Sequence, residues 1–183
     1  MKVVIGLDLS VNSTGITVFK GDERIYYLIV SKMTKQMKEC KEVSIIEYEK
    51  KDNINENLKQ IGDIVESIID KYDVDMVIIE DVAMGAMRSR SIIDLTGLNY
   101  WIRCLLMKRN IKYITIPPTQ WKKDLIGNGQ ATKDLIVDNW KRLTGNDFRL
   151  KKVDDIADSY FLGLYGLENY KNEKNDNIIY IYF

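Results

Sequence analysis

Four acidic residues stand where their side chains could act together. Asp8 and Glu80 each end a short apolar run that is typical of a buried strand. Asp155 and Asp158 are three residues apart in a segment with helical spacing, which puts them on one helix face. Carboxylate oxygens are the ligands that hard cations such as Mg²⁺ prefer. The pattern predicts a metal site built from these four carboxylates.

The chemistry that such a site could perform is phosphoryl transfer. Four carboxylates that converge repel one another unless a cation lies between them. Two Mg²⁺ ions about 4 Å apart would form a site for in-line displacement, one activating water and the other stabilising the leaving 3′ oxygen, and we expect Mn²⁺ to substitute. Taken singly, each acid has an ordinary explanation as a helix cap, a turn residue or a solvated side chain. Taken jointly, they favour the metal site.

Composition removes several other kinds of chemistry. The chain of 183 residues contains no histidine, which excludes Ser-His-Asp and Cys-His triads and zinc sites built on imidazole. Its two cysteines, Cys40 and Cys104, have no CxxC spacing, as expected in a reducing cytoplasm. No apolar run reaches about 18 residues and no signal-peptide pattern opens the chain, so we expect a cytoplasmic protein without a membrane span.

Charge is unevenly distributed although the net charge is zero. Residues 1–80 have a net charge of −4, residues 81–152 of +8 and residues 153–183 of −4. A basic middle between acidic ends suits a protein that binds a polyanion beside a carboxylate metal site. Solvated helix faces with uneven charge explain the distribution equally well.

The hydrophobic pattern predicts the elements that must position these residues. We expect strands at 3–8, 16–19, 24–30, 76–80 and 112–116, and helices at 55–72, 91–109, 132–143 and 153–167. Residues 32–52 give no clear pattern, and Pro117-Pro118 ends the last strand. The order predicts an α/β fold with a mixed five-stranded sheet and helices on both faces. We expect one domain over 1–170, followed by a polar loop and a short strand or tail over 171–183.

Four motifs resemble those of the RuvC-type Holliday-junction resolvases, which have a ribonuclease H-like fold. Residues 6–15 are similar to the opening GxDxSxxxTG, and Ile78-Ile79-Glu80 to the strand-ending Glu. Residues 120–133 resemble the segment QVKxxxxGxGxAxK without a gap, and residues 155–158 resemble a terminal DAAD-like motif. The resemblance covers residues 1–168 in order and spacing, and it is specific because four motifs follow in sequence.

The resemblance implies a homodimeric, Mg²⁺-dependent endonuclease that nicks two opposed strands of a four-way DNA junction. It implies that the four carboxylates bind the metals and that Lys122 and Lys133 approach the DNA phosphate near them, where a positive charge offsets developing negative charge. It also implies that the helix over 91–109, with Ile93, Tyr100 and Trp101 off its main apolar stripe, contributes to the dimer interface. We further expect DNA contacts from Lys122, Lys123, Arg88, Arg90 and Ser13.

One departure from the family bears on the substrate. Ala83 stands where the family typically has an aromatic residue that wedges into the junction. Met84 or Met87 could serve as the wedge or could be core residues. Without the aromatic, a broader set of branched DNA, including forks and flaps, becomes a plausible substrate. The short chain and the missing aromatic suggest a viral relative, which would act in the host cytoplasm.

Three other functions stay open. Residues 8–15 also resemble the first phosphate loop of actin-like sugar kinases and ATPases, but a second loop of the DxGGT kind is absent and the chain is too short for two such halves. A non-catalytic relative that only binds branched DNA would not need all four acids. A ribonuclease H-like nuclease acting on RNA–DNA hybrids is disfavoured by the lysine-containing segment over 120–133.

Overall fold

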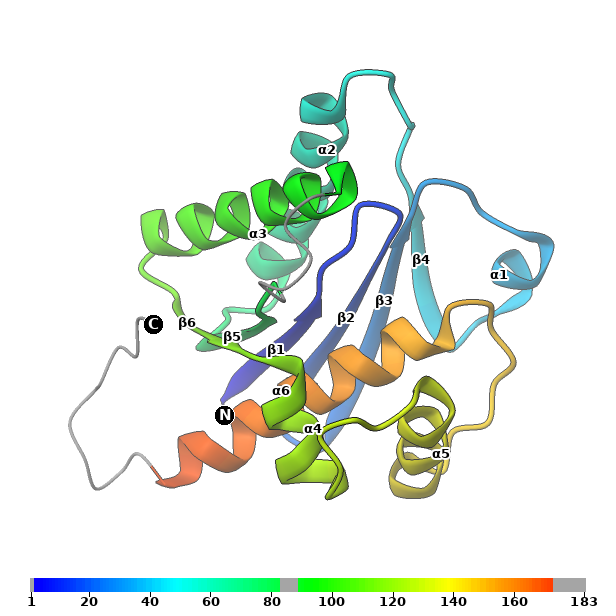
Figure 1. The fold of residues 1–183 in the computed structure, drawn as a ribbon, viewed down its shortest axis with the longest axis vertical. Coiled ribbons are helices and arrows are strands. Elements are labelled where there is room, and N and C mark those ends of the chain that lie inside the picture. Colours follow the sequence, from blue (N-terminus) through cyan, green and yellow to red (C-terminus); the bar gives the residue numbers. More distant parts are fainter. Residues whose placement is uncertain (1, 83–88, 173–183) are drawn as a thin grey trace.

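A single mixed sheet forms the centre of the computed structural model, which describes residues 2–82 and 89–172 (Figure 1). Its strands are β1 (Val3–Asp8), β2 (Ser13–Lys20), β3 (Glu23–Val30), β4 (Val43–Glu47), β5 (Met76–Glu80) and β6 (Lys112–Ile116), in the spatial order β4-β3-β2-β1-β5-β6. Strands β1, β2 and β3 form an antiparallel meander. The pairs β1–β5, β5–β6 and β3–β4 are parallel.

Helices cover both faces of this sheet (Figure 1). They are α1 (Lys35–Glu39), α2 (Ile54–Lys71), α3 (Arg90–Lys108), α4 (Pro118–Ile126), α5 (Lys133–Thr144) and α6 (Val153–Asn172). None of the helices in the described ranges is long and apolar enough to cross a membrane. The α/β class and the mixed sheet with two covered faces are as the sequence predicts.

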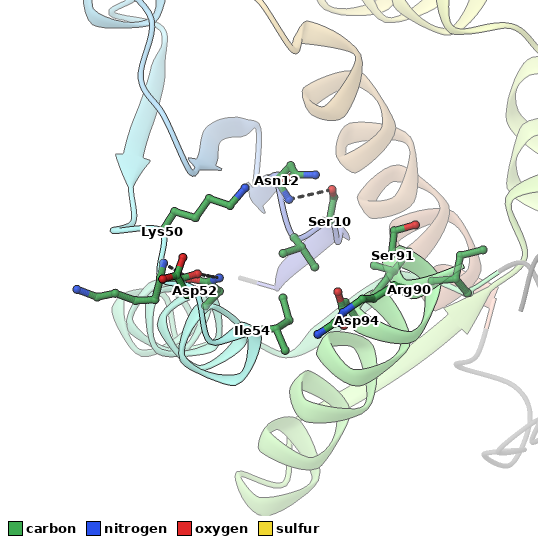
Figure 2. Close-up of a pocket in the computed structure, with 13 residues that line it drawn as sticks. Ser10, Asn12, Lys50, Asp52, Ile54, Arg90, Ser91 and Asp94 are labelled. Atoms are coloured by element: carbon green, nitrogen blue, oxygen red, sulfur yellow. Dashed lines mark hydrogen bonds between the residues drawn. The ribbon is translucent and has the colours of Figure 1, made fainter. Parts of the chain in front are cut away.

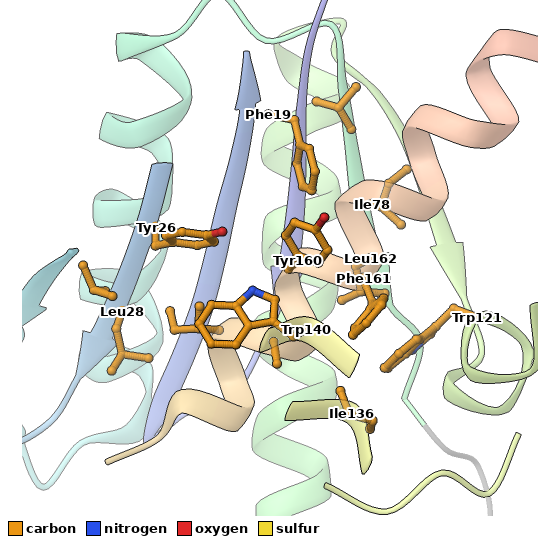
Figure 3. Packing of buried hydrophobic residues seen from close by; sticks show 14 of the residues in the cluster. Phe19, Tyr26, Leu28, Ile78, Trp121, Ile136, Trp140, Tyr160, Phe161 and Leu162 are labelled. Atoms are coloured by element: carbon orange, nitrogen blue, oxygen red, sulfur yellow. The ribbon is translucent and has the colours of Figure 1, made fainter. Parts of the chain in front are cut away.

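Two hydrophobic cores lie on opposite faces of the sheet, because successive side chains of a strand point to opposite sides. In β1, Ile5 and Leu7 belong to the core under α2 and α3. Val4 belongs to the other core, which α4, α5 and α6 cover and in which Trp121, Trp140 and Phe161 are prominent (Figure 3). Both faces of the central strands are therefore buried, which explains their continuous apolar runs.

The sheet has six strands, so the prediction of five was wrong by one. The additional strand β4 lies within residues 32–52, which show no clear hydrophobic pattern. It pairs with β3, and the connection between the two strands contains α1. It is a short edge strand with a single fully buried side chain, Val43, and charged residues on either side weaken its pattern. The sequence also gave no sign of α4. Pro118 begins this helix, because the first helical position needs no N–H donor.

Helix α6 lies directly on β1 and β2 because three glycines remove side chains from the contact. A Cβ atom on Gly6 would lie 2.0 Å from the Ser159 carbonyl oxygen, and one on Gly163 would lie 2.2 Å from the Phe19 ring. A Cβ atom on Gly15 would lie 2.0 Å from the carbonyl oxygen of Asp155. This close crossing carries the first turns of α6 to the end of β1 where Asp8 stands.

Candidate active site

Strand pairing brings the predicted acids to one edge of the sheet. Strands β1 and β5 are parallel with Leu7 opposite Ile79, so Asp8 and Glu80, the next residues, end the two strands side by side. On its other side, Asp8 pairs with Gly15 of β2, the glycine against which the Asp155 backbone packs. Asp8 therefore lies between strand β5 and helix α6.

The electrostatics show that the four carboxylates are close together. Burial raises the pKa of Asp8 well above its usual value, and repulsion from Asp158, Glu80 and Asp155 raises it further. Burial also raises the pKa of Asp158 to about 7, and repulsion from Glu80 is the next cause of that rise. Asp8 and Asp158 thus resist ionisation both because they are buried and because other acids of the cluster lie nearby.

Glu80 is held at both its side chain and its backbone. The indole Nε1–H of Trp121, from α4, donates to Glu80 Oε2 at 2.8 Å. The side-chain amide of Asn99, from α3, donates to the Glu80 carbonyl oxygen at 3.1 Å. Burial raises the pKa of the Glu80 carboxyl, and the Trp121 hydrogen bond and the Lys122 charge oppose that shift. Neither Trp121 nor Asn99 was assigned a role from the sequence.

Ser13, which was predicted to contact DNA, has a buried side chain that contacts one of the acids instead. Its hydroxyl donates to Asp155 Oδ2. Burial raises the pKa of Asp155, and this hydrogen bond opposes the shift. Because Ser13 is only 3% exposed and its hydroxyl is bonded to a carboxylate, the hydroxyl orients that carboxylate and is not displayed to DNA. The position of Ser13 at the start of β2 was the only sequence feature that could have indicated a role inside the site.

The residues fit a divalent metal by their chemistry. All the side-chain donors are carboxylate oxygens, the preferred ligands of Mg²⁺ and Mn²⁺. Asp158 Oδ1 is buried and has no hydrogen-bond partner, which is costly unless something such as a cation satisfies it. Within the described residues, no three acidic side chains already form a metal-binding arrangement.

Lys133, the predicted catalytic lysine, is the first residue of α5 and lies beside the carboxylates. Its ammonium group pairs with Asp154, which raises the pKa of Lys133. The same positive charge partly opposes the rise in the pKa values of Asp8, Asp155 and Asp158. Asp154 is the acid bonded to this lysine and is not one of the four predicted ligands.

The remaining predicted DNA contacts lie at different distances from the carboxylates. Lys122 is close enough to oppose the rise in the pKa values of Glu80 and Asp158, and its Nζ lies 5.3 Å from the Trp121 ring centroid. Lys123 is exposed on the next position of α4. Arg88 lies outside the described residues, as do Ala83, Met84 and Met87.

Arg90 lines a hollow of about 560 Å³ (Figure 2). The β1–β2 loop, the segment before α2 and the N-terminus of α3 form its walls. Ser10, two residues beyond Asp8 in the sequence, is one of its lining residues. Its charged lining residues are Lys50, Lys51, Arg90, Asp52 and Asp94. The two lysines were missed because the segment that holds them was not assigned to any element.

Strand order and site together define the class of protein. A three-strand meander followed by parallel strands, with acids at the adjacent ends of β1 and β5 and on a helix that crosses them, is the ribonuclease H-like arrangement. A family model described as crossover junction endodeoxyribonuclease RuvC matches residues 5–162. The chain belongs to the RuvC family.

Curated relatives carry the same family name. The RuvC protein of Helicobacter pylori strain ATCC 700392 / 26695 is 32% identical over 104 residues, which cover 55% of this chain. The match spans 65% of the length of the H. pylori protein. The RuvC protein of Sulfurovum sp. strain NBC37-1 is 22% identical over 171 residues, covering 93% of this chain and 98% of the relative.

Solved structures share the fold at low sequence identity. Thermus thermophilus RuvC in complex with Holliday junction substrate has a TM-score of 0.67 at 13% identity, covering 94% of this chain and 96% of the other. Fowlpox virus resolvase, solved with substrate Holliday junction DNA, has a TM-score of 0.53 at 19% identity, covering 92% and 98%. These likenesses confirm the ribonuclease H-like fold that the resemblance implied.

Proposed function

We propose that this protein is a metal-dependent endonuclease that nicks opposed strands of four-way DNA junctions and of other branched DNA. The observation that carries the proposal is the convergence of Asp8, Glu80, Asp155 and Asp158 at one sheet edge in a chain of the RuvC family. The four acids belong to three separate elements, β1, β5 and α6, so their proximity is a product of the fold.

The four carboxylates are the proposed metal ligands. Two bound Mg²⁺ ions, or Mn²⁺ in their place, would activate water and stabilise the leaving oxygen of the phosphodiester. Ser13 and Trp121 each occupy one oxygen of a carboxylate and leave the second oxygen available. Lys133 would exchange its contact with Asp154 for the scissile phosphate and offset the charge that develops there.

Basic residues around the site are the proposed DNA contacts. Lys122 and Lys123 lie on α4 at one side of the carboxylates, and Arg90 and Lys50 line the hollow near Ser10. Phosphates are the parts of DNA that such side chains bind irrespective of base sequence. Arg88, in the undescribed segment next to Arg90, is proposed to contribute as well. That two structural neighbours were solved with Holliday junction DNA supports a branched substrate. A DNA substrate also supports a cytoplasmic location.

A homodimer through α3 is part of this proposal. Ile93, Tyr100, Trp101 and Met107 on this helix are between 50% and 63% exposed, an unusual concentration of large apolar side chains at the surface. Association through one shared patch gives a two-fold symmetric dimer. Such a dimer would place two active sites on opposed strands of a junction that has the same symmetry.

The test is cleavage of labelled synthetic DNA. The purified protein is incubated with a four-way junction, a fork and a linear duplex, each with Mg²⁺ or EDTA, alongside Glu80→Gln. We expect symmetric, Mg²⁺-dependent nicks in the junction that disappear in the variant. Cutting of the fork as well would establish the broader substrate range. If folded protein cuts none of the three, the nuclease proposal fails.

A further inference from the structure

The contact between α4 and Glu80 has properties that simple core packing does not require. The Trp121 side chain is fully buried, yet its polar N–H donates to a carboxylate 41 residues away in sequence. A phenylalanine or an aliphatic side chain could fill an apolar site without needing an acceptor. The family-like segment QVKxxxxGxGxAxK has valine at the place that Trp121 occupies in this chain.

The orientation of the indole is fixed from its other side as well. The Trp121 ring stacks on Phe161 of α6 with 5.9 Å between ring centroids and 14° between the planes (Figure 3). Phe161 is buried and follows Asp158 by three residues on the same helix. Trp121 therefore connects α6, which holds two of the carboxylates, to the carboxylate that ends β5.

The hydrogen bond restricts how Glu80 can turn. A Glu side chain has three rotatable bonds, and fixing Oε2 on a rigid indole leaves Oε1 as the oxygen with freedom to meet a ligand. Hydrogen-bond partners of metal ligands commonly contribute 10–100-fold to metal affinity or activity, because they hold the ligand in its binding orientation.

We infer that Trp121 is a positioning residue that holds the Glu80 carboxylate in the orientation needed to bind a divalent metal ion. The inference rests on the proposed function in that it takes Glu80 to be a metal ligand. It assigns to α4 a role in building the metal site in addition to a role in DNA contact.

Trp140 provides a matched control. It is as fully buried as Trp121 and belongs to the same hydrophobic core (Figure 3). Its indole N–H faces the Tyr26 hydroxyl and makes no hydrogen bond to any of the four acids. Trp121→Phe and Trp140→Phe therefore remove similar volumes from one core, but only the first removes a hydrogen bond to a proposed metal ligand.

The experiment compares Mn²⁺ binding by calorimetry in the wild type and the two variants, with thermal denaturation of each. We expect Trp121→Phe to weaken Mn²⁺ binding about 10–100-fold and Trp140→Phe to change it less than about threefold. Junction cleavage by Trp121→Phe should recover as Mn²⁺ is raised, since affinity rather than chemistry is impaired. Equal affinity of Trp121→Phe and wild type, whatever the loss of thermal stability, would overturn the inference.

A second measurement uses the unaltered protein, so it does not depend on the folding of Trp121→Phe. The chain has three tryptophans, and their ¹⁵N-labelled indole signals in NMR can be assigned with Trp101→Phe and Trp140→Phe. Addition of Mg²⁺ should shift the Trp121 Nε1–H signal and leave that of Trp140 in place. A Trp121 signal that does not move when Mg²⁺ binds overturns the inference.

The two proposals fail in different ways. Metal binding with the Trp121 shift, but without cleavage of any branched DNA, would support the role of Trp121 and overturn the nuclease proposal. Absence of any metal binding by the wild type would overturn both.

Discussion

Individual polar contacts decide how the carboxylates of this protein are presented. Ser13 bonds Asp155, Trp121 bonds Glu80, and the ammonium of Lys133 pairs with Asp154 just outside the cluster. The first two contacts hold proposed ligands in place. The third holds a cation beside the site in a contact that can be exchanged, because the Lys133 side chain is 68% exposed.

Lys133→Ala should separate catalysis from folding. We expect single-turnover junction cleavage at saturating Mg²⁺ to fall about 100-fold, because a positive group near the developing charge is lost. The melting temperature should change little, since an exposed ion pair contributes little to stability. Asp154→Asn is the control, because it frees the lysine without removing it and should leave most of the cleavage rate. A Lys133→Ala protein with the wild-type rate would remove this residue from the proposed mechanism.

At the scale of elements, the close packing of α6 on the sheet determines where two of the four carboxylates lie. The strand ends that carry Asp8 and Glu80 could be predicted from the sequence, because buried strands have local apolar patterns. The helix with Asp155 and Asp158 could be predicted from its spacing. Edge strand β4 could not, since its short run lies among lysines and glutamates.

The hydrogen bonds that hold the carboxylates could not be predicted from the sequence, for a reason different from that for β4. The Ser13–Asp155 bond joins residues 142 positions apart, and the Trp121–Glu80 bond joins residues 41 apart. No local pattern encodes such a contact, because it depends on how α4 and α6 pack on the sheet. For that reason Ser13 was predicted to contact DNA, and Trp121 was noted in a motif without a role.

Gly15→Ala tests the packing of α6. Because its Cβ would lie 2.0 Å from the Asp155 carbonyl oxygen, the helix must move or the variant must unfold. We expect a loss of about 3 kcal/mol or more in the free energy of unfolding, and a melting temperature lower by about 10 °C. The measurement is thermal denaturation followed by circular dichroism.

Gly97→Ala is the control for that change. It lies in α3, where an added Cβ would meet only Leu58 Cδ1 at 3.4 Å, an ordinary contact. Alanine is favoured over glycine in a helix interior, so this variant should be as stable as the wild type or more stable by up to about 1 kcal/mol. Equal stability of the two variants would contradict the tight crossing of α6.

For the whole molecule, the carboxylate cluster connects stability to pH and to metal ions. Burial raises the pKa values of Asp8, Glu80, Asp155 and Asp158. An acid with a raised pKa binds more protons in the folded than in the unfolded chain, so the free energy of unfolding falls as pH rises. The fall begins near the usual aspartate pKa of about 4 and, for Asp158, continues to about 7.

We therefore expect the melting temperature in EDTA to be lower at about pH 8 than at about pH 5.5, by about 4–8 °C. Excess Mg²⁺ should remove much of that difference, because bound cations stabilise the ionised carboxylates. Asp158→Asn should flatten the pH dependence in EDTA and raise the melting temperature at the higher pH. A metal-free protein whose stability does not fall between these pH values would show that the acids are not clustered in solution.

The glycines under α6 also affect how mutational surveys of this protein should be understood. A screen that scores only loss of DNA cleavage detects a displaced carboxylate and a deleted one as the same phenotype. Gly6, Gly15 and Gly163 should therefore rank with Asp8 and Asp155 among the positions that tolerate no substitution, although they have no functional group. Positions at which substitution abolishes cleavage would therefore include residues that set the distance between helix α6 and the sheet, as well as residues that perform chemistry.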